Sequence, residues 1–293
     1  MQSVLEILKK CEQYFGQKGI PNPGHDAQLL LARALGCKRL ELFLMFDRPL
    51  GEKSLSAFRE FARRRARREP LQHILGDCEF FGIRLKSDRR ALVPRPETEE
   101  LCEIAAGKLS ERGADARAEI LDLGCGSGAI ALSLAAKFPQ LAATAADMSE
   151  EALELARENL ELLDSGEGGF PRFPGIAERV KIVRSDWFEG VCGKFDAIAA
   201  NPPYLTGAEL ASAEPEVRDF DPRSALVSAD GGMRDLKKII SAAPDFLNPG
   251  GILICECGLQ QPDRLVEEFA GLYSSAHALP DLSRRTRFAL FAK

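Results

Sequence analysis

The stretch Asn201-Pro202-Pro203-Tyr204 combines residue types that suit chemistry on a planar amino group. It follows an apolar run at 195–200. The two prolines lack a backbone N–H and have a fixed φ, so they end that predicted strand and stiffen its exit. The Asn201 side-chain oxygen and a backbone carbonyl can accept the two hydrogens of a conjugated NH2 group, and the Tyr204 ring can lie against its plane. Taken alone, the same four residues also suit an ordinary proline-rich loop.

A glycine-rich turn upstream predicts a cofactor site. The apolar run 120–123 leads into the turn, and a predicted helix follows at 129–137. Glycines let such a turn tighten and let a ligand lie against backbone N–H groups at the helix N-terminus. The residues that we expect to bind the cofactor here are Gly124, Cys125, Gly126, Ser127 and Gly128.

Acidic residues follow the next two predicted strands. Asp147 ends the run 141–146, 19 residues beyond the last glycine of the turn, where a carboxylate reaches a ribose diol. The G-x-G-x-G spacing favours S-adenosylmethionine over a dinucleotide, because a pyrophosphate needs more room. Asp186 and Trp187 follow the run 180–183 and suit the two sides of an adenine. A core position is the alternative for this tryptophan, the sole one in the chain.

These motifs require a scaffold that brings strand ends together. Apolar strand segments alternate with helical segments between residues 99 and 293, which predicts a parallel, doubly wound α/β sheet of the Rossmann-like kind. Segments 274–279 and 287–291 are expected to close an antiparallel edge. The glycine turn and the polar residues above all follow strands, and the carboxyl ends of parallel strands meet at one edge of a sheet. We therefore expect a single binding site there.

Residues 1–75 predict a separate helical domain. Apolar residues recur at helical spacing in segments 4–15, 26–35, 38–46 and 54–68, which is typical of a small bundle. This domain has 14 Lys and Arg against 8 Asp and Glu, a net charge of +6. Since the whole chain carries −5, the remainder carries −11. A basic head favours an acidic partner, although a solvated helix face explains so modest a charge equally well. It has no catalytic constellation, and we interpret it as a recognition domain.

Residues 76–98 are predicted to connect this head to a catalytic domain at 99–293. The segments 79–85 and 91–93 indicate the two strands of a β-hairpin. Pro94-Arg95-Pro96-Glu97-Thr98 then forms a stiff strap, since each proline biases its predecessor towards extended geometry, and we expect a helix cap near Thr98. A linker needs neither Arg95 nor Glu97 specifically, so both are candidates for substrate binding.

Composition excludes several classes of protein. Hydrophobic content of 45% and charged content of 28% are typical of globular proteins. No apolar run approaches the roughly 20 residues that span a membrane, and the N-terminal residues lack a signal pattern, so we expect no membrane partner and a cytoplasmic location. The eight cysteines form no C-x-x-C pair and the three histidines lie far apart, which predicts reduced thiols and no metal site.

Nearly the whole chain resembles the HemK/PrmC-type protein-glutamine methyltransferases of peptide chain release factors. Asn-Pro-Pro-Tyr is shared with enzymes that methylate the amino group of adenine, whereas its combination with the Pro-Arg-Pro-Glu-Thr strap is much more specific. The chain departs from the family in a longer loop at 165–175 and in Arg284, where the family tends to have glycine. The stretches that carry the resemblance are 70–76, 92–99, 121–130, 185–188, 201–204 and 216–223.

The resemblance implies a class I methyltransferase fold behind a helical domain that docks the release factor. It implies S-adenosylmethionine as methyl donor, S-adenosylhomocysteine as product and a glutamine side-chain amide as acceptor. In such enzymes the glycine turn and the residues matching Asp147, Trp187 and Asn201 hold the cofactor, while the Asn-Pro-Pro-Tyr loop, including Pro203, holds the glutamine. We expect Asn201 and the Pro202 carbonyl to accept the two amide hydrogens and Tyr204 to pack against the amide plane.

Three alternatives stay open at this level. An adenine-N6 methyltransferase uses the same motif but needs a basic path for nucleic acid, and the charge of −11 outside the head argues against a direct nucleic-acid substrate. A glutamine of a ribosomal protein is an alternative substrate within the family. A non-catalytic adaptor that binds a partner through the basic head would not need the cofactor residues.

Overall fold

The computed structural model describes residues 2–111 and 117–293, and it divides the chain into two compact units. The first comprises Met1–Gly76 with the later segment Glu214–Phe220, and the second comprises Asp77–Ala213 with Asp221–Lys293. The division therefore differs from the expected boundaries of 1–75, 76–98 and 99–293. The hairpin belongs to the second unit, and a short segment that follows the Asn-Pro-Pro-Tyr motif belongs to the first.

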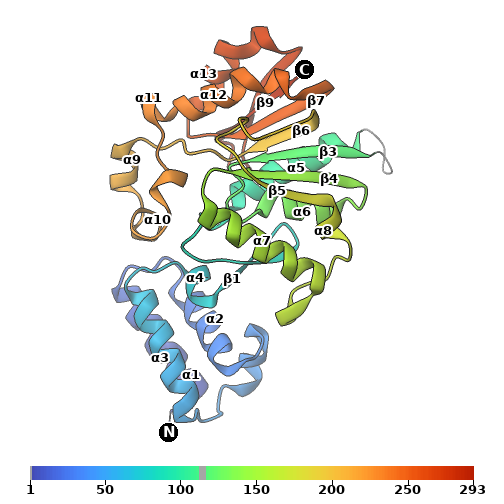
Figure 1. Cartoon of the computed structure of the whole chain (residues 1–293). Helices are drawn as coiled ribbons and strands as arrows, with labels where there is room; N and C mark the ends of the chain where they lie inside the picture. Colours follow the sequence, from blue (N-terminus) through green and yellow to red (C-terminus); the bar gives the residue numbers. More distant parts are fainter. Residues whose placement is uncertain (1, 112–116) are drawn as a thin grey trace. The chain divides into compact units, whose positions relative to one another are not determined.

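Short helices build the first unit (Figure 1). Ser3 caps the first of them, because its side chain accepts the N–H of Glu6 while the Glu6 carboxylate accepts the N–H of Ser3. Gly36, in the left-handed conformation, ends the second. Apolar side chains of these helices form one buried core, which confirms the predicted bundle. The helices are α1 (Val4–Gln17), α2 (Pro23–Leu35), the 3-10 helix η1 (Arg39–Met45), α3 (Glu52–Ala66), α4 (Leu71–Leu75) and α10 (Pro215–Arg218).

The segment predicted as a helix over 38–46 is a 3-10 helix whose buried side differs from the expected apolar positions. Leu42 is fully buried in η1, whereas Leu40 is 69% exposed and Leu44 is 87% exposed. A 3-10 helix has three residues per turn, so its faces repeat at i and i+3 rather than at α-helical spacing. As a result, Leu40, Phe43 and Leu44 all lie on the surface of the first unit.

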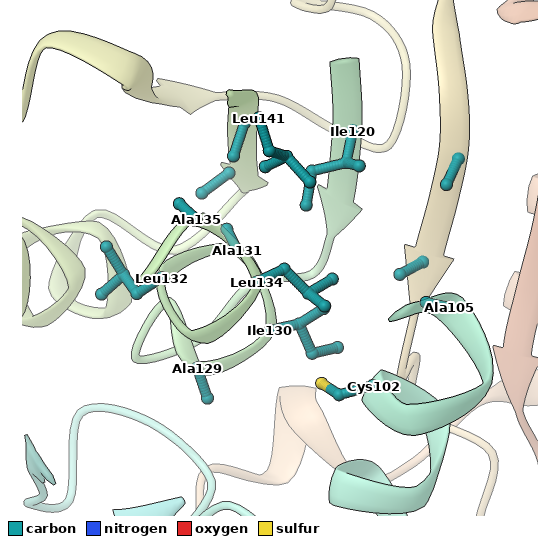
Figure 2. Packing of buried hydrophobic residues seen from close by; sticks show 14 of the residues in the cluster. Cys102, Ala105, Ile120, Ala129, Ile130, Ala131, Leu132, Leu134, Ala135 and Leu141 are labelled. Atoms are coloured by element: carbon teal, nitrogen blue, oxygen red, sulfur yellow. The ribbon is translucent and has the colours of Figure 1, made fainter. Parts of the chain in front are cut away.

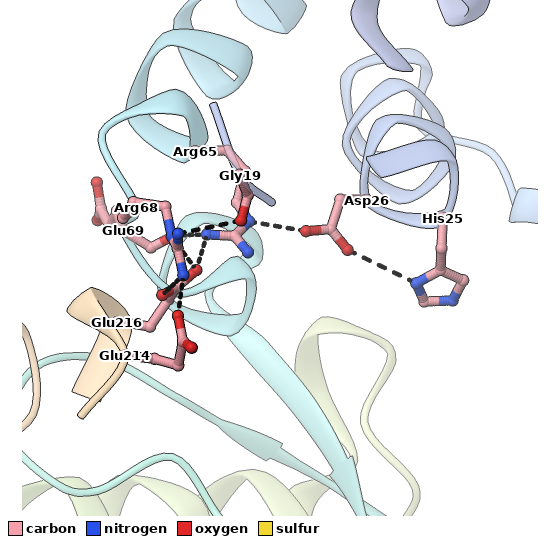
Figure 3. A network of polar contacts seen from close by, with 8 residues as sticks. All are labelled: Gly19, His25, Asp26, Arg65, Arg68, Glu69, Glu214 and Glu216. Carbon is pink, nitrogen blue, oxygen red and sulfur yellow. Dashed lines mark hydrogen bonds and ion pairs between the residues drawn. The ribbon is translucent and has the colours of Figure 1, made fainter. Parts of the chain in front are cut away.

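An ion-pair network holds the later segment within the first unit (Figure 3). The Arg65 side chain is 6% exposed, and its guanidinium contacts Asp26 at 2.7 Å and Glu216 at 2.8 Å. Arg68 contacts Glu216 at 2.6 Å and also pairs with Glu214 at 2.6 Å. A buried guanidinium needs such partners, because an unpaired charge is costly away from water. Arg65 near the end of α3 and Arg68 just after it thus bind acidic residues from much later in the chain.

The hairpin of the second unit is shorter than expected. Its strands are β1 (Asp77–Phe80) and β2 (Ile83–Lys86), with Phe80 opposite Ile83. The two-residue turn puts Phe81 at φ 44° and Gly82 at φ 83°, a left-handed region that glycine adopts at little cost. The prediction of strands over 79–85 and 91–93 was wrong, because it placed this turn-forming glycine inside a strand.

A seven-stranded sheet lies at the centre of the second unit (Figure 1). Its order is β5-β4-β3-β6-β7-β9-β8. The first five strands run parallel to one another, whereas β9 is antiparallel both to β7 and to β8. Parallel neighbours need crossovers, which the intervening helices supply. The doubly wound sheet and its antiparallel edge are therefore confirmed. The strands are β3 (Ala118–Leu123), β4 (Leu141–Asp147), β5 (Val180–Arg184), β6 (Phe195–Ala200), β7 (Leu247–Glu256), β8 (Ser275–Pro280) and β9 (Thr286–Ala292).

Alternate residues of β3 pack on opposite faces of this sheet. Ile120 joins an apolar cluster with α5 and α6 (Figure 2), whereas Leu121 and Leu123 join a cluster with α12 and α13. Burial on both faces explains why the parallel strands are nearly continuous apolar runs. The longer helices are α5 (Pro96–Ser110), α6 (Ala129–Lys137), α7 (Glu150–Ser165), α12 (Arg234–Ala242) and α13 (Gln261–Phe269).

Short helical segments complete the connections of the second unit. None of the helices in the described part of the chain is long and apolar enough to cross a membrane. The short α-helices are α8 (Ile176–Arg179), α9 (Gly207–Ser212) and α11 (Ala229–Gly232), and the 3-10 helices are η2 (Glu167–Gly169), η3 (Arg223–Ala225), η4 (Ala243–Asp245) and η5 (Ala270–Leu272).

Candidate active site

A cavity of about 580 Å³ opens at the carboxyl ends of the parallel strands in the second unit. Its wall includes residues 124–127 of the glycine turn after β3, but not Gly128, together with Asp147 at the end of β4, Trp187 after β5 and Asn201 after β6. These residues meet because parallel strands end at the same edge of the sheet. The structure thus brings the separately predicted motifs to one cavity.

The glycine turn is tied to the neighbouring strand. The N–H of Gly124 donates to the carbonyl of Ala146 at 2.8 Å, and the N–H of Gly126 donates to the Asp147 carboxylate at 2.9 Å. Gly124 adopts a φ of 70°, and a Cβ there would lie 3.5 Å from the Trp187 ring. The positive φ therefore favours glycine at this position, whereas a Cβ would make only an ordinary van der Waals contact with the ring. Cys125, Ser127 and Asp147 line the cavity beside it.

Asp147 joins the turn to the place predicted for a ribose. One of its oxygens accepts the N–H of Gly126 and the other accepts the N–H of Ser149, each at 2.9 Å. A carboxylate oxygen has two lone pairs, so each can still accept a hydrogen bond from a hydroxyl group in the cavity. The acid can thus bind a ligand and hold the turn at the same time.

Trp187 lies partly in the core and partly in the cavity wall. Its ring packs against an apolar cluster and lines the cavity, so the two alternatives for this residue are not exclusive. Its φ of 51° is uncommon for a large side chain, and its carbonyl accepts the hydroxyl of Ser185 at 2.6 Å. Asp186 is exposed at the cavity and pairs with Lys238 at 3.0 Å.

Asn201 is held through its amide nitrogen. Its Nδ2 donates to Thr98 Oγ1 at 3.0 Å, and the Thr98 hydroxyl donates to Glu256 Oε2 at 2.8 Å. Asn201 and Thr98 both line the cavity, while Glu256 is fully buried behind them. Asn201 Oδ1 makes no hydrogen bond within the described part of the chain, so it can accept one from a ligand.

Tyr204 reaches the same carboxylate from the other side. Its hydroxyl donates to Glu256 Oε1 at 3.0 Å and accepts from Arg287 Nη2 at 2.8 Å. Burial raises the pKa of Tyr204, and the charge of Glu256 raises it further, so the phenol stays protonated. Burial also raises the pKa of Glu256, which the Arg287 guanidinium opposes. We call these five residues, Asn201, Thr98, Glu256, Tyr204 and Arg287, the Glu256 network.

The rest of the Asn-Pro-Pro-Tyr motif is closely packed. Pro203 lines the cavity, whereas Pro202 is buried and, among the described residues, neither it nor Tyr204 forms part of the cavity wall. The Tyr204 carbonyl accepts from Gln261 Nε2 at 3.0 Å, and a Cβ at Gly232 would lie only 2.1 Å from that carbonyl. The loop therefore has little freedom to move. The predicted contacts of Pro202 and Tyr204 with substrate stay predictions.

Arg95 and Glu97 form ion pairs at the edge of the site. Arg95 contacts Asp221 at 2.7 Å, and Glu97 contacts Arg285 at 3.3 Å. Burial raises the pKa of Asp221 to about 6, although the Arg95 charge opposes this rise. Neither Arg95 nor Glu97 is among the described residues of the cavity wall, and their expected role in substrate binding is an untested prediction.

Several polar residues behind the motif escaped the sequence interpretation. Thr98 was expected at a helix cap, but α5 begins at Pro96 and the Thr98 hydroxyl serves the Glu256 network instead. Glu256 ends an apolar strand, which is the same signal that pointed to Asp147 and would have found it. Asp122, the last polar residue of β3, is also buried in this region, and burial raises its pKa to about 7.

The residues around the cavity fit S-adenosylmethionine. The glycine turn lets a ligand approach backbone N–H groups, Asp147 suits a ribose diol, and the Trp187 ring suits an adenine face. No group of three or more metal-ligand side chains occurs in the described ranges. The fold and this site define a class I S-adenosylmethionine-dependent methyltransferase.

Comparisons with known proteins identify the family more closely. The model of the PrmC N-terminal domain matches residues 6–76, and that of the methyltransferase small domain matches residues 105–215. Release factor glutamine methyltransferase of Chlorobaculum tepidum is 41% identical over 87% of this chain and 85% of its own length. That of Rhodopirellula baltica is 36% identical over 99% of this chain and 96% of its own length. The human MTRF1L release factor glutamine methyltransferase is 30% identical over 90% of this chain and 78% of its own length.

The chain belongs to the family of release factor glutamine methyltransferases. This confirms the resemblance that the motifs indicated. Among solved structures, the catalytic domain of human METTL16 in complex with an RNA hairpin superposes with a TM-score of 0.54 at 15% identity, over 79% of this chain and 81% of that one. At that identity the likeness supports the fold alone.

Proposed function

We propose that this protein methylates the side-chain amide nitrogen of a glutamine in a peptide chain release factor. The observation that carries the proposal is the position of Asn201: its free amide oxygen lies in the wall of the cavity that also contains the glycine turn and Asp147. Membership of the family supports the same substrate, since relatives that match nearly the whole chain are release factor glutamine methyltransferases.

An amide nitrogen is a poor nucleophile, because its lone pair is delocalised into the carbonyl. In this proposal Asn201 Oδ1 and the Pro202 carbonyl accept the two hydrogens of the glutamine NH2 group. Two acceptors on one side of the nitrogen favour a tetrahedral geometry and orient the lone pair. Positioning of this kind lowers the barrier, and acceptors placed where positive charge develops stabilise the transition state.

The chain's own residues hold the reactants and need not remove a proton beforehand. Bound S-adenosylmethionine supplies an electrophilic sulfonium methyl group and leaves as S-adenosylhomocysteine. The methylated nitrogen becomes acidic, so its proton can leave without a strong base. Tyr204 stays protonated and is held in the Glu256 network, so we assign it a packing role beside the amide.

We propose that the first unit recognises the folded release factor. Residues 1–75 carry a net charge of +6, whereas the rest of the chain carries −11. Opposite charges raise the rate of encounter between two proteins and help to orient them. The negative charge outside the head also favours a protein substrate over direct binding of nucleic acid, and we place the reaction in the cytoplasm, with translation.

Mass spectrometry of a purified release factor incubated with this protein and labelled S-adenosylmethionine tests the proposal. We expect one labelled glutamine and no label when that glutamine is replaced by glutamate. A ribosomal-protein fraction and a DNA oligonucleotide serve as parallel substrates. Label on either of these, with none on the release factor, contradicts the proposal.

A further inference from the structure

Hydrogen bonds run without a break from the cavity wall to a buried carboxylate. Asn201 Nδ2 donates to Thr98 Oγ1 at 3.0 Å, and Thr98 donates to Glu256 Oε2 at 2.8 Å. The other oxygen, Glu256 Oε1, accepts from the Tyr204 hydroxyl at 3.0 Å and from Arg287 Nη2 at 3.1 Å. Each oxygen of this carboxylate is thus an acceptor.

The direction of these hydrogen bonds follows from the chemistry of the groups. An ionised carboxylate only accepts hydrogen bonds. The Arg287 guanidinium that faces Glu256 only donates, and its positive charge favours the ionised form of Glu256. Thr98 has a single hydroxyl hydrogen, and once it is donated to Glu256 the hydroxyl oxygen can only accept. The one donor on the Asn201 amide is its nitrogen. The oxygen of that amide is therefore turned away from Thr98 and towards the cavity.

We propose that Glu256 and Thr98 are positioning residues that fix which end of the Asn201 amide faces the substrate. The two ends of an amide have nearly the same shape, so packing alone distinguishes them poorly. A flipped Asn201 would present its own NH2 group to the substrate NH2 group, and neither could accept. This inference rests on the proposed role of Asn201 as an acceptor.

The burial of Glu256 supports a role of this kind. A charged side chain that is fully buried costs several kcal/mol of desolvation, and apolar residues of similar volume often fill such sites with no loss of stability. Leu253, Ile254 and Cys255 precede Glu256 in β7 and are all buried apolar residues. Glu256 is the one charged residue of this strand, and its carboxylate accepts a hydrogen bond from Thr98 in the cavity wall.

Glu256→Gln tests the direction of the hydrogen bonds with almost no change of shape. The Arg287 guanidinium can only donate, so it requires an acceptor at its end of the new side chain, and the NH2 group of that side chain must face Thr98. Thr98 must then donate to residue 201 instead of accepting from it, and the Asn201 amide flips. We expect the single-turnover rate of methyl transfer to fall by about 100-fold, as for the loss of one preorganised hydrogen bond. Calorimetric affinity for S-adenosylmethionine should change little, whereas affinity for a glutamine peptide should fall. The melting temperature should also fall, because Arg287 loses its charged partner, so the rates are compared at a temperature where the variant is folded.

A second substitution should restore part of this loss. In the Glu256→Gln background, Asn201→Asp can accept from Thr98 with one oxygen and present the other to the substrate. We expect the double variant to exceed Glu256→Gln by about tenfold in rate, since coupled neighbours are non-additive. If the two substitutions instead reduce the rate independently, or if Glu256→Gln alone keeps the parental rate, the proposal is overturned.

Thr98 offers a matched pair that leaves the Glu256–Arg287 ion pair in place. Thr98→Ser keeps the hydroxyl and should keep most of the rate, whereas Thr98→Val keeps the shape, loses the hydroxyl and should lose rate with unchanged cofactor affinity. This pair tests the orienting role of Thr98 even if Glu256→Gln does not fold. Equal rates for Thr98→Ser and Thr98→Val would refute the proposal. Normal transfer by Asn201→Ala would instead overturn the proposed function itself.

Discussion

The carboxylate of Asp147 accepts a hydrogen bond from the backbone N–H of Gly126 at 2.9 Å. The acid at the end of β4 therefore holds the glycine turn that follows β3. This relationship gives Asp147 two roles, as a proposed ligand of the ribose and as a support for the turn beneath the cofactor. Replacement of its side chain should disturb both.

Asp147→Ala should weaken binding of S-adenosylmethionine by about 10- to 100-fold, because a hydrogen bond to a charged group contributes about 1.5–3 kcal/mol. Asp147→Asn retains one acceptor oxygen and should lose less. Isothermal calorimetry measures both affinities, and Glu154→Ala, an exposed acid on α7, is the control for loss of charge. An Asp147→Ala protein with parental cofactor affinity would show that the ribose contact is wrongly assigned.

Asn201→Ala should reduce single-turnover methyl transfer by about 100-fold or more, because it removes a preorganised acceptor and leaves β6 intact. Asn201→Asp keeps an acceptor but adds a negative charge beside the Glu256 network, so its rate should lie between those of Ala and the parent. Both rates are measured with saturating cofactor and a release-factor substrate. Near-normal transfer by Asn201→Ala would reduce the motif to a structural strand end.

Arg65→Ala should destabilise the first unit by about 3–5 kcal/mol, since it takes the guanidinium from the buried Asp26 and leaves Glu216 with Arg68 alone. Arg59→Ala is the matched control, because Arg59 pairs with Glu52 on the exposed side of the same helix and such pairs contribute only about 0–1 kcal/mol. Denaturant unfolding gives both values. Equal effects for the two variants would mean that the buried ion pairs of Arg65 do not stabilise the unit.

The contribution of Glu216 should depend on pH. Burial raises the pKa of Glu216, but hydrogen bonds from Arg68 and Arg65 lower it more, so its net pKa in the folded protein lies below the ordinary 4.5. A lowered pKa stabilises the fold above the unfolded value and loses that effect as pH falls through the folded value. The stability difference between the parent and Glu216→Gln should therefore be largest near neutral pH and shrink below about 4.5. A difference that does not change with pH would contradict this assignment.

Basic residues of the first unit should matter for whole release factor and not for a short glutamine peptide. Lys53 and Arg67 are exposed, and changing both to glutamate should raise KM for the protein substrate several-fold, with less effect at high salt, where charges are screened. Lys181→Glu, an exposed change in β5, is the control. Point variants are preferable to removal of residues 1–70, which would also take the arginine partners from Glu216. Unchanged kinetics on both substrates would refute the recognition role.

Much of the site could be predicted from the sequence because its parts obey local rules. The glycine turn, Asp147, Trp187 and Asn201 each follow an apolar strand, and a parallel sheet brings all such strand ends to one edge. The turn of the hairpin was misplaced for an equally local reason. Whether Gly82 lies within a strand or in a two-residue turn depends on which residues pair across it, and a short run of residues does not show that.

The tertiary structure alone decided which polar groups support the site and which segment joins the first unit. Thr98 and Glu256 lie 158 residues apart in the sequence, and Arg65 and Glu216 lie 151 apart, yet each pair is in hydrogen-bond contact. No periodicity or spacing links such residues, because their meeting depends on how whole helices and strands pack. The local sequence shows which residue types follow each strand. The direction of the Asn201 amide, in contrast, depends on partners that only folding brings within 3 Å.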